Sequence, residues 1–155
     1  SAKGSPVDPW AELQIEVLWS QRQQLDLPGV IKVLLASLDA LERQGLRPHA
    51  VLIEDTANGP AVCQLLQRQV PGLIAIPPKG SKASRAHAVA PLLEAGQVRF
   101  ATKAQSLMDE LLAFSPTSGV DDQVDAFCQG VLWIEAHYWR GRGYGKAPVP
   151  MLFSR

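Results

Sequence analysis

Carboxylate side chains occur at two places where a folded chain can bring them together. Glu54 and Asp55 follow a short apolar run, and open α/β sheets gather ligands at the carboxyl ends of their strands. The second group, Asp121, Asp122 and Asp125, lies at the start of a helical pattern. Carboxylates that converge from distant segments suit Mg²⁺ or Mn²⁺, which prefer oxygen ligands. Two such ions can activate a water molecule and stabilise a leaving oxygen in phosphodiester cleavage.

Each acid also has a purely structural interpretation. Glu54 and Asp55 could cap the next turn, and acids in a first helical turn are favoured by the helix dipole. At about 100° per residue, the apolar side chains of this last helix share one face. Asp121 falls near the edge of that face, Asp125 somewhat further round and Asp122 almost opposite. The geometry therefore favours Asp121 as a carboxylate held beside the core.

Basic residues lie between the two acidic groups, at Lys79, Lys82 and Arg85. Lys82 and Arg85 are three apart on the first turn of a predicted helix, so they share a side. Together with the free N–H groups of a helix start they could bind phosphate, although they could equally be solvated surface charges. We expect Glu54 and Asp121 to approach each other, with Lys82 or Arg85 close enough to relieve their repulsion.

Other chemistries find less support in the residue types. His49, His87 and His137 are widely separated, and none pairs with a cysteine at ligand spacing. Cys63 and Cys128 lie inside apolar patterns and are interpreted as buried reduced thiols, which suit a cytosol. The sequence contains no nucleophile elbow, Walker phosphate loop or dinucleotide-binding pattern.

Composition narrows the classes of protein further. The 155 residues are 46% hydrophobic and 19% charged, which fits one globular domain with a sizeable core. Fifteen Lys plus Arg balance fifteen Asp plus Glu, so a uniformly basic nucleic-acid coat is excluded although a local basic patch is not. No apolar run approaches the roughly 20 residues of a membrane span, and no secretory signal is expected.

Strand and helix patterns alternate along the chain, which predicts an α/β domain whose sheet is at least partly parallel. We expect the first three strands to share one sheet. Beyond Trp139, a Gly- and Arg-rich stretch predicts a flexible tail over residues 140–155, leaving 1–139 as the domain. The strands are expected at 13–19, 50–54, 73–76 and 98–100, and the helices at 28–46, 59–70, 81–94, 103–113 and 121–137.

Taken together, these segments resemble the C-terminal nuclease domain of the large terminase subunit of tailed bacteriophages. The strongest pieces are Val-Leu-Ile-Glu-Asp-Thr-Ala-Asn-Gly at 51–59 and Pro-x-Gly-Ser-Lys-x-x-Arg-Ala at 78–86. Glu-Ala-Gly-Gln-Val at 94–98 follows, and then Asp-Glu-Leu-Leu-Ala-Phe running into Val-Asp-Asp-Gln-Val-Asp-Ala. Each piece is weak alone, but four in the right order and spacing are specific.

The resemblance implies an RNase H-like fold, with a mixed sheet flanked by helices, and a metal-dependent endonuclease that cuts viral DNA during packaging. It implies that Glu54 is the second catalytic acid and that Asp121 or Asp122 is the third, all as ligands of Mg²⁺ or Mn²⁺. Lys79, Lys82 and Arg85 would then lie near the DNA backbone. The implied partners are double-stranded DNA, the terminase ATPase domain, the small terminase subunit and the portal. The implied setting is the cytoplasm of a bacterial host, with a phage or prophage gene.

The sequence also departs from the family pattern. The first catalytic Asp of the family sits on an opening strand, just ahead of a stretch like residues 1–6. We therefore expect that acid to lie outside the sequence, the opening strand to be incomplete and nuclease activity to be impaired. Val120 stands where related sequences often carry His.

Two other classes of function stay open at this stage. One is a non-catalytic module for DNA binding or packaging assembly, in which the acids act as caps and the basic group still contacts DNA. The other is a small-molecule-binding α/β domain, which would need an apolar pocket at the sheet edge.

Overall fold

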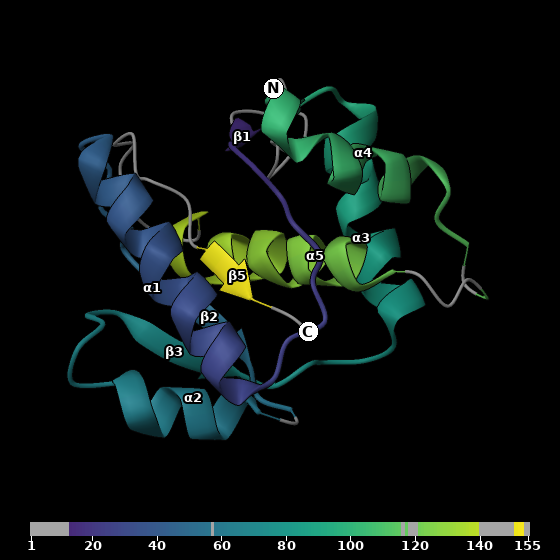
Figure 1. Cartoon of the computed structure of the whole chain (residues 1–155). Helices are drawn as coiled ribbons and strands as arrows, with labels where there is room; N and C mark the ends of the chain where they lie inside the picture. The colour runs from purple at the N-terminus through teal and green to yellow at the C-terminus, as the bar shows by residue number, and fades with distance from the viewer. Residues whose placement is uncertain (1–12, 57, 116, 118–120, 140–150, 154–155) are drawn as a thin grey trace, which may run out of the picture.

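The structure is a computed structural model that describes residues 13–56, 58–115, 117, 121–139 and 151–153. Its described strands form two small sheets in which every pair is parallel. One has the order β3-β2-β5 (Figure 1), and the other is β1-β4. The strands are β1 Ile15–Val17, β2 Val51–Glu54, β3 Leu73–Ile76, β4 Val98–Phe100 and β5 Met151–Phe153.

Helices connect and cover these strands, and several begin at residues that the sequence marks as helix starts. Asp26 accepts a hydrogen bond from the Gly29 N–H at 2.9 Å and caps the first helix, while Ser81 caps the third by accepting from the Ser84 N–H at 3.1 Å. Gly96, with φ of +69°, follows the third helix as the predicted C-terminal glycine. The helices are α1 Leu27–Arg43, α2 Gly59–Leu66, α3 Lys82–Glu94, η1 Thr102–Ala104, α4 Gln105–Leu112, α5 Asp122–Ile134 and η2 Glu135–Trp139.

The prediction that the first three strands share one sheet is wrong for the first of them. β1 pairs with β4, with Ile15 opposite Val98. The Gln97 side-chain amide donates to the Leu13 backbone carbonyl at 3.0 Å, and the Gln97 backbone carbonyl accepts from the Ile15 N–H at 2.9 Å. With only three residues, β1 is held where Ile15 is buried, which is against α3 and α5.

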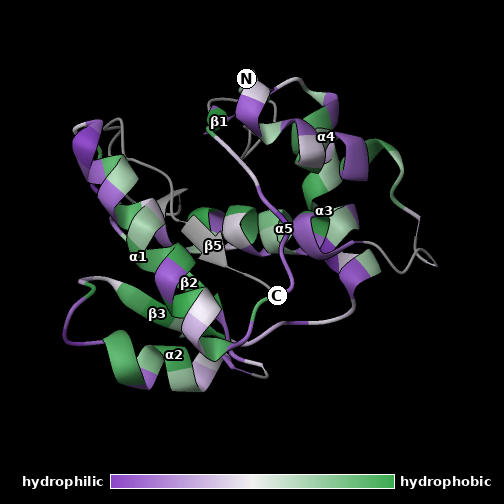
Figure 2. Cartoon of the chain, viewed as in Figure 1, coloured by the Kyte–Doolittle hydropathy of each residue, from purple (hydrophilic) through white to green (hydrophobic). Residues whose placement is uncertain are grey.

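Among the described residues, the buried apolar side chains form two cores. The first, here called the α1–α2 core, lies around β2 between α1 and α2, where Figure 2 shows β2 and β3 as mostly hydrophobic. The second, the α3–α5 core, joins α3, α4, α5 and β1. Buried members of the α1–α2 core are Leu34, Val51, Ile53, Val62, Leu66 and Val70. Those of the α3–α5 core are Ile15, Val89, Leu92, Leu107, Val124, Cys128 and Val131.

The predicted tail over residues 140–155 lies outside the described residues except at Met151–Phe153. Those three residues form β5, which pairs in parallel with β2, so the tail prediction is wrong there. Met-Leu-Phe is an apolar run, and pairing it beside β2 gives that strand a hydrogen-bonded neighbour on each side. Among the described residues, no helix is long and apolar enough to span a membrane.

Candidate functional site

Glu54 ends β2 with its carboxylate fixed by two neighbours. Its Oε1 accepts a 2.6 Å hydrogen bond from Thr56 Oγ1, and its Oε2 accepts a 2.8 Å bond from Gln129 Nε2 on α5. Gly59 opens α2 so close to this strand end that a Cβ there would collide with the Glu54 carbonyl oxygen. The start of α2 therefore packs directly against the end of β2, which carries the Glu54 carboxylate at the sheet edge.

Asp121, directly before α5, does not cap that helix with its side chain. Asp121 stands at the N-cap position, but its side chain makes no capping hydrogen bond. Glu110 of α4 does that work instead, because its Oε1 accepts from the backbone N–H groups of Gln123 and Val124 at 2.8 and 3.1 Å. The capping interpretation fails for Asp121, and its carboxylate is available for other contacts.

Lys82, at the first position of α3, meets these aspartates. Its Nζ lies 2.6 Å from Asp121 Oδ1 and 3.6 Å from Asp122 Oδ1. Asp121 is 7% exposed, whereas the Lys82 side chain is 45% exposed. The hydrogen bond to Asp121 raises the pKa of Lys82, and the charges of Asp121, Asp122 and Asp125 act in the same direction. The expectation that a basic side chain reaches the acids is confirmed.

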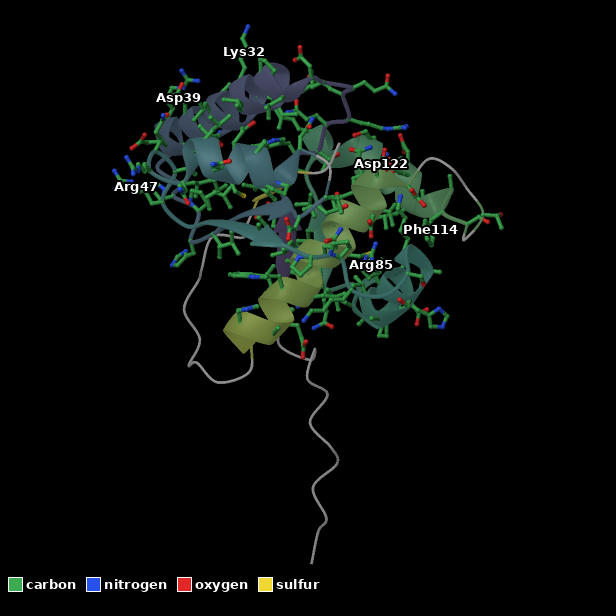
Figure 3. The ribbon with its side chains drawn as sticks, turned by 90° about the horizontal axis from the view of Figure 1, so that it is seen from below. Lys32, Asp39, Arg47, Arg85, Phe114 and Asp122 are labelled. Carbon is green, nitrogen blue, oxygen red and sulfur yellow. The ribbon has the colours of Figure 1, made fainter. Side chains whose placement is uncertain are left out.

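Arg85 is buried against α5 rather than facing solvent (Figure 3). Its Nε and Nη2 donate to the two carboxylate oxygens of Asp125 at 2.7 and 2.8 Å, and both residues are 6% exposed. Its Nη1 donates to the carbonyl oxygens of Lys79 and Gly80 at 3.1 and 2.8 Å. One guanidinium thus ties the loop before α3 to the first turn of α5.

Gln129 connects the strand acid with the helix acids. It lies one turn after Asp125 on α5, and its Nε2 donates to Glu54 Oε2 at 2.8 Å and approaches Asp125 Oδ2 at 3.4 Å. Its Oε1 is buried and has no hydrogen-bond partner among the described residues. The amide nitrogen therefore faces the carboxylates, which is the orientation that avoids placing a third oxygen beside them.

A cavity of about 170 Å³ opens between the end of β2 and the start of α5. Glu54 and Asp122 both line it, together with Lys82 and Asp125. Its remaining lining residues are Val30, Ile53, Thr56, Asn58, Gly59 and Val62. Carboxylates from two distant segments thus share one cavity with an ammonium group.

The predicted site residues differ in whether they lie at the cavity, near it or in a buried ion pair. Glu54 and Asp122 line the same cavity, whereas Asp121 is not among its lining residues and contacts Lys82, which is. Lys79 is exposed in the loop before α3, while Arg85 is buried in its ion pair with Asp125. The described residues contain no group of three or more His, Cys, Asp or Glu side chains placed to hold a metal ion.

Some contributors to the site were missed from the sequence. Glu110 and Gln129 gave no signal of their own, because a cap from another helix and an amide bridge to a distant strand depend on tertiary packing. The spacing of Asp125 and Gln129 carried a usable signal, since residues four apart on a helix lie on one face.

The acids from a strand end and a helix start thus lie beside a basic loop at the carboxyl end of β2, where open α/β sheets bind their ligands. Residues 36–132 match the family model described as the terminase RNaseH-like domain. The match covers well over half of the chain, so the chain belongs to this family. No curated protein and no solved structure matches it.

Proposed function

We propose that this domain is the nuclease module of a DNA-packaging terminase and cleaves double-stranded DNA with Mg²⁺ or Mn²⁺. The carrying observation is that Glu54 and Asp122, 68 positions apart by their numbers, line one cavity that also contains Lys82. Membership of the terminase RNaseH-like family supports the reaction class. Duplex DNA, the packaging ATPase, the small terminase subunit and the portal are the proposed partners, in the cytoplasm of an infected or lysogenic host.

The chemistry of the donor set fits a hard divalent ion. Glu54, Asp121 and Asp122 offer only carboxylate oxygens, and no thiolate or imidazole competes among the residues that line the cavity. These three acids are the proposed metal ligands and catalytic residues. A bound ion supplies a water of lowered pKa and stabilises the leaving oxygen.

Residues of the chain itself orient the carboxylates and neutralise charge around the proposed metal site. Thr56 and Gln129 each hold one oxygen of Glu54, which fixes the plane of the carboxylate. Lys79 and Lys82 are exposed and are the proposed contacts for the DNA backbone. Arg85 supports this role from beneath, because it holds the carbonyl groups of the loop that carries Lys79.

The test is plasmid nicking with Mn²⁺, comparing the chain with Glu54→Gln and with Asp39→Asn on the outer side of α1 as a matched control. We expect slow nicking that Glu54→Gln reduces at least about tenfold, which equals a loss of about 1.4 kcal/mol of transition-state stabilisation, and that Asp39→Asn leaves unchanged. Nicking that Glu54→Gln does not alter would refute the assignment.

One observation favours a second candidate, a non-catalytic module for DNA binding or packaging assembly. Each proposed acid already has a partner within the chain, such as Lys82 for Asp121 and Gln129 for Glu54. In that case DNA binding would fall steeply with salt and ignore divalent metal. A salt titration of duplex binding with and without Mg²⁺ separates the two functions.

A further inference from the structure

The Lys82 ammonium contacts the Asp121 carboxylate, which a divalent cation would need as a ligand. Its ammonium lies 2.6 Å from Asp121 Oδ1 and 3.6 Å from Asp122 Oδ1, and Lys82 also lines the cavity that Glu54 shares. A Mg²⁺ ion bonds its oxygen ligands at about 2.0–2.1 Å. An ammonium and a metal ion on the same carboxylate oxygen would therefore repel each other at short range.

The carboxylate and the ammonium differ in their freedom to move. Asp121 is 7% exposed and is held at the start of α5, whose first turn is capped by Glu110. The Lys82 side chain is 45% exposed and stands on the first turn of α3, next to the loop that carries Lys79. Lys82 can therefore turn toward solvent or a phosphate group without unfolding the helix, whereas Asp121 cannot leave.

We propose that Lys82 is an internal counter-ion that occupies the acidic site, so that divalent metal binds only as the ammonium leaves Asp121. This inference rests on the proposed function, because it takes Glu54, Asp121 and Asp122 as the metal ligands. A DNA phosphate that attracts Lys82 also frees Asp121. By linkage, the backbone and the metal then favour each other's binding, and loading is coupled to the presence of DNA.

The first test measures the Mn²⁺ dissociation constant by calorimetry, without DNA, for the chain, Lys82→Met and Lys79→Met. Both variants lose one positive charge from the same region, but only Lys82 contacts the aspartates at 2.6 and 3.6 Å. We expect Lys82→Met to bind Mn²⁺ at least about fivefold more tightly, the lower end of usual coupling between sites. Lys79→Met should change the affinity by less than about twofold.

Glu54→Gln distinguishes failure of this inference from failure of the proposed function. If Mn²⁺ binding is absent, or is unchanged by Glu54→Gln in both the parent and Lys82→Met chains, the metal site itself is wrong and both proposals fall. If binding depends on Glu54 but Lys82→Met binds no more tightly than Lys79→Met, the counter-ion is overturned and the metal site stands.

A second measurement needs no variant and covers the case in which Lys82→Met does not fold. Acetylation of lysine amines by an activated ester is followed by mass spectrometry with and without saturating Mg²⁺. We expect Mg²⁺ to accelerate modification of Lys82 while that of Lys79 stays constant. An unchanged rate at Lys82 would overturn the inference.

Discussion

Arg85 and Asp125 form the interaction whose removal should cost this domain the most stability. Both residues are 6% exposed, and the pair is bidentate at 2.7 and 2.8 Å. Arg85→Met leaves the Asp125 carboxylate buried without its partner and takes a donor from the carbonyl groups of Lys79 and Gly80. Breaking a buried pair from one side costs about 3–5 kcal/mol, a large part of the roughly 5–15 kcal/mol that stabilises a typical domain.

The assay is urea unfolding followed by circular dichroism, arranged as a double-mutant cycle. Asp125→Leu alone should be as damaging as Arg85→Met, because it leaves a buried guanidinium. The double variant should recover much of the loss, since two apolar side chains need no compensation, giving an interaction energy of about 2–3 kcal/mol. Arg85→Lys should fall between the parent and Arg85→Met, because an ammonium keeps the charge but cannot form the two-pronged contact.

Two outcomes would refute this reasoning. One is a cost below about 1 kcal/mol for Arg85→Met, which is the range of an exposed ion pair. The other is additivity of the two single variants within about 0.5 kcal/mol, which would mean that the side chains do not act together. In either case the buried pair would not be a main source of the stability of this domain.

Two further predictions concern single residues. Gly59→Ala should destabilise the domain by about 1–3 kcal/mol, because the new Cβ collides with the Glu54 carbonyl oxygen. Gly130→Ala should instead stabilise α5 by up to about 1 kcal/mol, because nothing lies within 4 Å of the new Cβ. Thermal unfolding of both variants checks this prediction. Burial raises the pKa of Cys128 to about 12 from 9.0, so above pH 9 the unfolded chain loses a proton that the folded chain keeps. Stability should therefore fall between pH 9 and 12 by up to about 1.4 kcal/mol per pH unit, and Cys128→Ala should remove that part of the slope in urea titrations.

The sequence predicted the elements well where local signals are strong. β3 and β4 occupy the expected residues, and α3 starts directly after its Ser81 cap. The strand expected at 13–19 is only Ile15–Val17 in the structure, and it pairs with β4 instead of joining the sheet of β2 and β3, because a strand pattern carries no local information about which neighbour it pairs with. Its position depends on Ile15 packing against α3 and α5, a contact between distant parts of the chain.

The candidate site was only partly predictable for the same reason. Helical geometry identified Asp121 as a carboxylate beside the core, and the structure has it buried at the start of α5. For Arg85 the sequence showed a positive charge near a helix start but not the carboxylate of Asp125 that neutralises it, forty positions later. Charge alone cannot tell a surface cation from a buried one, because the difference lies in a partner chosen by tertiary packing.

The two cores have a consequence for how this site can be tuned. Glu54 is carried by β2 of the α1–α2 core, whereas the aspartates and Lys82 are carried by helices of the α3–α5 core (Figure 1). The spacing between the strand acid and the helix acids thus depends on how the two cores pack against each other, and Gln129 bridges the two sides. Substitutions inside either core, many residues away from any carboxylate, can increase or decrease the distance between the strand acid and the helix acids. Selection can adjust the site through packing volume while every acidic residue stays the same.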